Sequence, residues 1–209
     1  MLTYRAAFDS IQWGLDLKKI FLIGGGGHCH SCIDVIESSE MYQIEGIFDN
    51  NKEVGRKILG YKVVGRDEDI PKFVSDDTYF LITIGQIKSS EIRKKTVHFV
   101  KASNGKFATI VSKRAYVSKY AKIGEGTIVM HDVLVNANAI VNEHVILNTK
   151  SVVEHDVIIE SFCHISTGAI VNGNCKIENG SFVGSLATIE QGKTVRNGML
   201  VKAGSFFRG

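Results

Sequence analysis

The sequence has little of what marks disulfide-stabilised or membrane-spanning proteins. Its 209 residues include four cysteines and one proline, Pro71. Four cysteines are too few for a disulfide framework in a chain of this size. No stretch approaches the roughly 18 consecutive apolar residues of a spanning helix. A single proline and 21 glycines instead favour long regular structure with many tight corners.

The sequence also lacks an excess of charge. The formal net charge is +3, and residues 1–108 carry 15 basic and 14 acidic side chains against 10 and 8 in residues 109–209. A nucleic-acid-binding protein concentrates Lys and Arg on one face, so this even distribution excludes that class. Residues 1–18, which contain charges and no apolar core, read as an N-terminal extension and not as a secretory signal. We therefore expect a cytoplasmic protein without a membrane span.

One repeat dominates the second half of the chain. Every sixth residue from Val111 onward is Ile, Leu or Val, which neither the 3.6-residue helix period nor simple strand alternation produces. The sixteen positions are Val111, Val117, Ile123, Val129, Val135, Val141, Leu147, Val153, Ile159, Ile165, Val171, Ile177, Val183, Ile189, Val195 and Val201.

Small side chains precede most of these aliphatic residues by two positions. A large residue inside each flat face and a small one near each corner is what a triangular prism of short strands requires. The repeat therefore predicts an all-β parallel β-helix over residues 109–209, with three hexapeptides in each coil and residues 18 apart stacked. Cys163 and Cys175 fall in the small inward positions, so we interpret them as packing residues.

The first half alternates strand-like and helix-like segments. Apolar runs at 19–23, 44–48 and 79–85 surround helical patterns that begin near residues 28 and 91. This alternation predicts a Rossmann-like α/β domain over residues 19–108, reduced to three or four parallel strands.

A glycine-rich turn follows the first of these strands. Gly24, Gly26 and Gly27 would allow backbone N–H groups to approach a phosphate at a helix N-terminus. Asp49, after the second strand, is placed to accept hydrogen bonds from a ribose or a base. Cys29 occupies the third glycine position of the dinucleotide fingerprint, so a mononucleotide or nucleotide-sugar fits better than a dinucleotide.

Together these segments closely resemble the bacterial sugar acetyltransferases of the PglD and NeuD type. The resemblance covers residues 19 to about 204 and rests on Gly27-His28, on 46–49, on 147–149 and on 154–156. It implies a left-handed β-helix, a homotrimer in glycan biosynthesis, acetyl-CoA between adjacent prisms, and a nucleotide-sugar between one N-terminal domain and a neighbouring prism. The chain ends at 204–209 without the family's glycine–proline–alanine tail, so we expect different contacts at the adenine end of CoA.

The resemblance also assigns residues. His155 matches the catalytic histidine, and Asp156 stands where a carboxylate, usually glutamate, follows it. His164, Gly173 and Gly184 match positions beside the thioester and pantetheine of CoA. The positions that correspond to sites near the sugar-nucleotide are Gly27, His28, Asp49 and Asn148.

The coil spacing supports His155 independently. It follows the inward Val153 by two residues, so it should point outward near a corner, between the small residues Ala137 and Gly173 in the neighbouring coils. Histidine exchanges a proton near neutral pH and suits the deprotonation of an attacking amine. Asp156 is the first choice for the carboxylate that orients this histidine, and Glu154 is the second.

Other interpretations remain beside this one. The same base could serve a hydroxyl in a sialic-acid-type O-acetyltransferase, and a non-catalytic nucleotide-sugar-binding scaffold is a further alternative. No metal is expected, because the segment 27–32 lacks a second pair of zinc ligands. His131, His144, His155 and His164 also lack the spacing of hexapeptide-type carbonic anhydrases, which bind zinc through three histidines.

Overall fold

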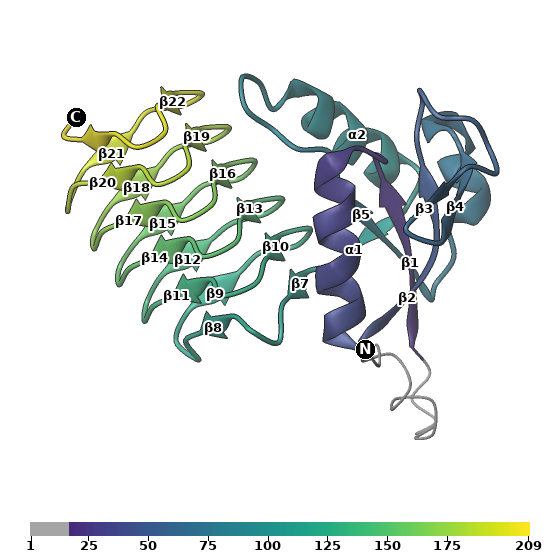
Figure 1. The fold of residues 1–209 in the computed structure, drawn as a ribbon, viewed down its shortest axis with the longest axis horizontal. Coiled ribbons are helices and arrows are strands. Elements are labelled where there is room, and N and C mark those ends of the chain that lie inside the picture. The colour runs from purple at the N-terminus through teal and green to yellow at the C-terminus, as the bar shows by residue number, and fades with distance from the viewer. Residues whose placement is uncertain (1–16) are drawn as a thin grey trace, which may run out of the picture.

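The structure is a computed structural model that describes residues 17–209, so the predicted extension lies almost wholly outside the described residues. It contains an α/β unit beside a long prism of stacked coils (Figure 1). None of the helices in residues 17–209 is long and apolar enough to cross a membrane.

A single twisted sheet forms the α/β unit. Its strands, in spatial order, are β3 (Lys57–Ile58), β4 (Tyr61–Gly65), β2 (Tyr42–Phe48), β1 (Lys18–Ile23), β5 (Thr78–Ile82) and β6 (Lys106–Phe107). All neighbours are parallel except the β3–β4 hairpin. The helices are α1 (Gly27–Ser39), α2 (Glu91–Ala102) and the 3-10 helix η2 (Asp67–Phe73). The expectation of three or four strands was wrong, because the hairpin and the two-residue β6 extend the sheet at its two edges.

The prism is a left-handed parallel β-helix with one short strand per face in every coil. The first face has β7 (Ile110–Val111), β10 (Ile128–Val129), β13 (Ile146–Leu147), β16 (His164–Ile165), β19 (Phe182–Val183) and β22 (Leu200–Val201). The second face has β8 (Tyr116–Val117), β11 (Leu134–Val135), β14 (Val152–Val153), β17 (Ile170–Val171), β20 (Thr188–Ile189) and β23 (Phe206–Phe207). The third face has β9 (Lys122–Ile123), β12 (Ile140–Val141), β15 (Ile158–Ile159), β18 (Lys176–Ile177) and β21 (Thr194–Val195).

The interior of the prism follows the six-residue period. Paired strands align residues 18 apart, as Val135 with Val153 and Val153 with Val171. The inward aliphatic side chains from Val129 to Val195 are fully or almost fully buried, and so are Cys163 and Cys175 in the small positions. The predicted fold class is confirmed.

The three faces of the prism differ in how far they are covered. On the first face, Ile110, Ile128 and Ile146 are buried, since the α/β unit packs against them. We call the turn from the first to the second face the first corner, the turn from the second to the third face the second corner, and the turn from the third back to the first face the third corner.

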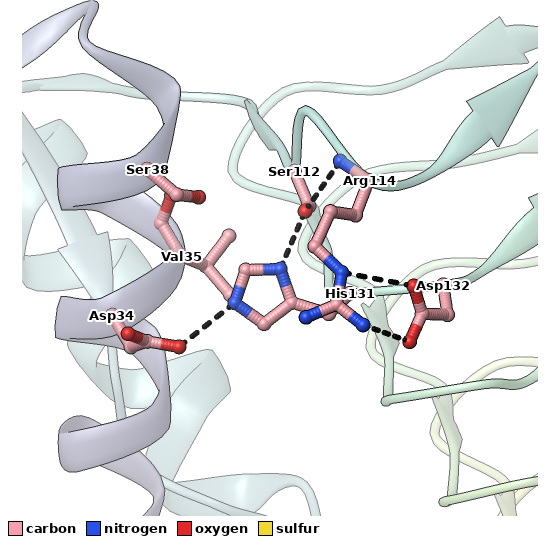
Figure 2. A network of polar contacts seen from close by, with 7 residues as sticks. All are labelled: Asp34, Val35, Ser38, Ser112, Arg114, His131 and Asp132. Atoms are coloured by element: carbon pink, nitrogen blue, oxygen red, sulfur yellow. Dashed lines mark hydrogen bonds and ion pairs between the residues drawn. The ribbon is translucent and has the colours of Figure 1, made fainter. Parts of the chain in front are cut away.

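Helix α1 lies along the first corner and is held there by a short polar chain (Figure 2). His131 Nε2 contacts Asp34 Oδ2 of α1 at 2.8 Å, and its Nδ1 contacts Ser112 Oγ at 2.6 Å. Lys113 reaches Glu40, just beyond the end of α1, with a further ion pair at 2.5 Å. Ser112 is 2% exposed, so no substrate reaches this serine, and the Asp34–His131–Ser112 chain joins the two units.

Candidate active site

A pocket of about 640 Å³ opens where the N-terminus of α1 meets the first corner of the prism. The α/β unit contributes Gly27, His28 and the loop between β5 and α2, and the prism contributes Asn148 and His164. The structure thus brings together four of the residues that the sequence analysis assigned to the ligand sites. The lining residues are Gly27, His28, Ser31, Gly85, Gln86, Ile87, Asn148, Thr149, His164 and Thr167.

His164 projects from β16 on the covered face and is 7% exposed. Its Nδ1 lies 2.7 Å from the main-chain oxygen of Gln86, and its Nε2 lies 3.2 Å from Asn148 Nδ2. Burial, opposed by the bond to Gln86 and aided by the positive charge of Arg93, lowers the pKa of His164 to about 4. The ring is therefore neutral at pH 7.

His28 stands in the first turn of α1, with its ring centroid 6.3 Å from that of His164. Its Nε2 is buried without a hydrogen-bond partner in the described structure. Burial lowers the pKa of His28 to about 4, and the neighbouring His164 and Arg93 lower it further. A buried acceptor or donor without a partner is costly, so a ligand that hydrogen-bonds to this nitrogen would gain from it.

A second pocket, of about 450 Å³, lies over the glycine-rich turn and includes Gly24, Gly26 and Asp49. Gly24 has φ +103°, and a Cβ there would lie 2.4 Å from Ile84 Cγ1, so both conformation and space require glycine. Asp49 accepts hydrogen bonds from the N–H of Gly25 at 2.7 Å and of Asn51 at 2.8 Å, and so shapes the turn. Nothing lies within 4 Å of a Cβ built on Gly26 or Gly27, which leaves their backbone accessible.

Cys29 contributes only its backbone to the turn, where its N–H donates to Gly26 O at 3.0 Å. It is fully buried in α1 against the core, as is Cys32, so the substituted glycine position leaves the turn itself unobstructed.

His155 stands at the second corner, away from both pockets. Its Nδ1 lies 2.8 Å from Asp156 Oδ2, and its ring covers Gly173 of the next coil, where a Cβ would approach Cε1 to 2.6 Å. The carboxylate in contact with His155 is therefore that of Asp156. Glu154, the second choice, accepts a hydrogen bond from Asn136 Nδ2 at 2.8 Å instead.

Within the prism, the predicted site residues thus fall into two groups on either side of the second face. Asn148 and Gly184 are on the first corner, and His155 and Gly173 are on the second, with the second face between them. A Cβ at Gly184 would lie 2.5 Å from the backbone nitrogen of Ala203, so this glycine is required by the stacking of the coils. A single chain does not bring the His155–Asp156 pair to the pocket of His28 and His164.

Gln86 of the pocket and Arg93, which donates a hydrogen bond to it, are among the residues that the sequence analysis did not identify. Gln86 and Arg93 are each 2% exposed, and both contact the main chain of the prism at the third corner. The partners of these two side chains are backbone oxygens, which every residue has. No pattern of residue types in the sequence therefore indicates the contacts.

Comparison with known proteins agrees with this architecture. The family model described as the PglD N-terminal domain matches residues 19–100. No curated protein matches the chain significantly.

Two solved structures are similar over nearly the whole chain. The acetyltransferase domain of PglB from Neisseria gonorrhoeae FA1090, in complex with acetyl coenzyme A, has a TM-score of 0.86 and 27% identity, covering 92% of this chain and 91% of that one. A histidine-to-asparagine mutant of perosamine N-acetyltransferase from Caulobacter crescentus, in complex with CoA and GDP-perosamine, has a TM-score of 0.85 and 26% identity, covering 91% and 89%. Residues 19–100 thus match the PglD N-terminal domain, and the whole chain shares the two-part architecture of these two sugar acetyltransferases.

Proposed function

We propose that this protein transfers the acetyl group of acetyl-CoA to the amine of a nucleotide-linked amino sugar, of the 4-amino-4,6-dideoxy type, in the cytoplasm. His155 is the general base, and transfer is direct within a ternary complex. Acetyl-CoA and CoA with GDP-perosamine are the ligands of the two similar structures, which supports this pair of substrates.

The observation that carries the proposal is the contact of His155 with Asp156. Hydrogen bonds from Asn138 and from His155 hold the pKa of Asp156 below its usual range, so the carboxylate is ionised at neutral pH. An ionised carboxylate only accepts, so His155 Nδ1 carries a proton, and the base acts through the lone pair of Nε2. The pair is exposed at the corner, where a substrate can reach it.

The reaction follows from this arrangement. The sugar amine attacks the thioester carbonyl carbon, a C–N bond forms, and the amine proton passes to His155 Nε2. The C–S bond then breaks, and the proton moves from His155 to the departing CoA sulfur. General-base assistance of this kind is worth roughly 100- to 10,000-fold, and positioning of the two substrates supplies the rest.

Three copies of the chain complete the site in this proposal. The second face carries Tyr116, Leu134, Val152, Ile170 and Phe206 as an outward apolar ladder with one polar member, Thr188. If three prisms turn this face to a common axis, the first corner of each lies beside the second corner of its neighbour. The His155–Asp156 pair of one chain then faces the His28–His164 pocket of the next.

The two domains divide the substrates between them. Residues 19–108 take the nucleotide at the turn of Gly24, Gly26 and Gly27, beside Asp49, with the sugar toward His28 and Asn148. Residues 109–209 take acetyl-CoA in the groove between neighbouring prisms, with its thioester toward His164 and its pantetheine arm beside Gly173 and Gly184.

Thiol release from acetyl-CoA in the presence of nucleotide amino sugars tests this proposal. We expect His155→Ala to fold and assemble as wild type and to lose at least 100-fold in kcat. His98→Ala, which removes an exposed histidine of α2, is the matched control and should keep full activity. Acetyl transfer to a sugar hydroxyl but to no amine would favour the O-acetyltransferase, and the absence of saturable acetyl-CoA binding would favour the scaffold.

A further inference from the structure

The third corner of the prism presents a column of backbone oxygens that the coils leave unused. His144, Phe162 and Gly180 are 18 residues apart and have φ of +55°, +60° and +71°. The coil amides bond to the residue before each of them, as Phe162 N–H to Glu143 O and Gly180 N–H to Ser161 O. Buried carbonyl groups require partners, so this column needs donors from outside the prism.

Gln86 and Arg93 supply these donors from the α/β unit. Gln86 Nε2 donates to Phe162 O at 2.8 Å and to Gly180 O at 3.1 Å. Arg93 Nη2 donates to His144 O at 2.5 Å, and its Nη1 donates to Gln86 Oε1 at 2.9 Å. The two side chains thus hold three successive coils and one another.

The same Gln86 contacts His164 through its main chain. A backbone oxygen only accepts, so the 2.7 Å contact requires His164 Nδ1 to carry the proton. The Nε2 atom is then unprotonated, and it accepts a hydrogen bond from Asn148 Nδ2 at 3.2 Å on the side of the pocket. Neutral histidine in water favours the opposite tautomer, with the proton on Nε2, so the protein selects the less common form here.

Arg93 adds a charge to this arrangement. Among residues 17–209, no carboxylate forms an ion pair with Arg93, although its side chain is buried. An unbalanced buried cation disfavours a second positive charge nearby. Burial of the His164 ring, with this charge beside it, therefore keeps His164 neutral, with a lone pair on Nε2.

We propose that Gln86 and Arg93 are positioning residues that fix His164 as the Nδ1-protonated tautomer, so that Nε2 stays an acceptor at the pocket and holds the Asn148 amide there for the bound substrate. The role assigned to His164 rests on the proposed function, whereas the selection of its tautomer does not. Neither Gln86 nor Arg93 takes part in the bond changes. Both act through His164.

Long-range ¹H–¹⁵N NMR of the histidine rings tests the tautomer in the protein without substrate. The signals of His164 are identified by their loss in His164→Asn. In the wild type, we expect the protonated nitrogen to be Nδ1. In Gln86→Met and Arg93→Met, we expect a mixture in which Nε2–H is the larger part, because the backbone acceptor is no longer held in place.

Asp34→Ala is the matched control. It breaks the contact of α1 with His131 at the first corner and leaves Gln86 in place, so a general loosening of the two units is separated from the specific effect. The His164 tautomer should not change in this variant. A wild-type His164 protonated at Nε2, or a tautomer unaffected by both Gln86→Met and Arg93→Met, overturns the proposal.

Kinetics give the second readout. Orienting groups of this kind change activity by about 10- to 100-fold, so Gln86→Met and Arg93→Met should lower kcat by about 10-fold with the KM for acetyl-CoA within about 3-fold. If the apparent kcat of these variants falls only in proportion to their fraction of unfolded protein, the positioning role is contradicted. If wild-type protein transfers no acetyl group at all, the proposed function fails, while the NMR comparison still decides whether Gln86 and Arg93 set the tautomer.

Discussion

Asn138 donates a hydrogen bond from Nδ2 to Asp156 Oδ1 at 2.6 Å, across the step between two coils. Both residues have φ near +60°, a conformation that Asn and Asp adopt more readily than most residues. The other oxygen of Asp156 contacts His155, so the chain Asn138–Asp156–His155 fixes the orientation of the imidazole.

Asn138→Gly removes this donor and keeps a residue that adopts positive φ. We expect kcat to fall by about 3- to 10-fold with little loss of stability, because an exposed hydrogen bond contributes about 1 kcal/mol. Steady-state kinetics and a thermal melt measure the two effects. Asn174→Gly, in the same column one coil further on, is the control and should leave kcat unchanged. Equal losses in both variants would show that the turn, and not the bond to Asp156, matters.

A site shared between two chains predicts complementation. His155→Ala and Asn148→Ala each destroy every site in a homotrimer, since each removes one of its two halves. Trimers reassembled from an equal mixture should regain about a quarter of wild-type activity, because a site is intact only where each chain supplies its undamaged half. In an equal mixture of wild type with the double variant His155→Ala/Asn148→Ala, a shared site again leaves about a quarter of full activity, whereas a site within one chain would leave about half. No recovery would place both residues in the same chain's site or in different functions.

The β-helix could be predicted from the sequence because every coil has the same packing requirement in its interior. Each face needs a large aliphatic residue from every coil, so the period of six persists from Val129 to Val195 without interruption. The number of strands in the α/β sheet could not be predicted in the same way. β6 has two residues, Lys106 and Phe107, and pairs with β5 only because the chain returns beside it. Two residues carry no periodicity of their own.

The candidate site was also predictable from the sequence only in part. His155 and Asp156 are neighbours in the chain, and their contact follows from coil spacing that the sequence displays. The meeting of His28 with His164 in one chain depends on how the α/β unit packs on the first face, and no pattern in the sequence predicted it. Gln86 was missed because its partners are backbone oxygens of Phe162 and Gly180, which any residue could supply.

Acid should destabilise the protein before its carboxylates titrate. Burial lowers the pKa values of His28, His144 and His164 to about 4, whereas an unfolded histidine titrates near 6.5. Between these values the unfolded state binds more protons than the folded state, so stability is fully present above pH 6.5 and is lost as pH falls toward 4. For the buried His144 the loss is on the order of 3 kcal/mol.

Urea unfolding at pH 7.0, 6.0 and 5.0 measures this loss. His144 packs its ring between Phe107 and Phe162 and has no hydrogen-bond partner for either nitrogen among the described residues. His144→Asn keeps a residue suited to its φ of +55° and removes one titrating group. The midpoint of this variant should depend less on pH than that of the wild type. An identical pH dependence would mean that His144 does not contribute.

Substitution of two comparable isoleucines, one on the second face and one on the third, tests assembly through the second face. Ile170 on the second face is 37% exposed, and Ile158 on the third face is 39% exposed, and both are the first residue of a two-residue strand. Ile170→Lys places a charge in the proposed apolar contact between prisms, where burying it unpaired is costly. We expect this variant to be monomeric by light scattering, with its circular dichroism intact and its acetyl transfer lost. Ile158→Lys should remain trimeric and active. Dissociation of Ile158→Lys instead would assign the interface to the third face, and would separate His155 from the pocket of the neighbouring chain.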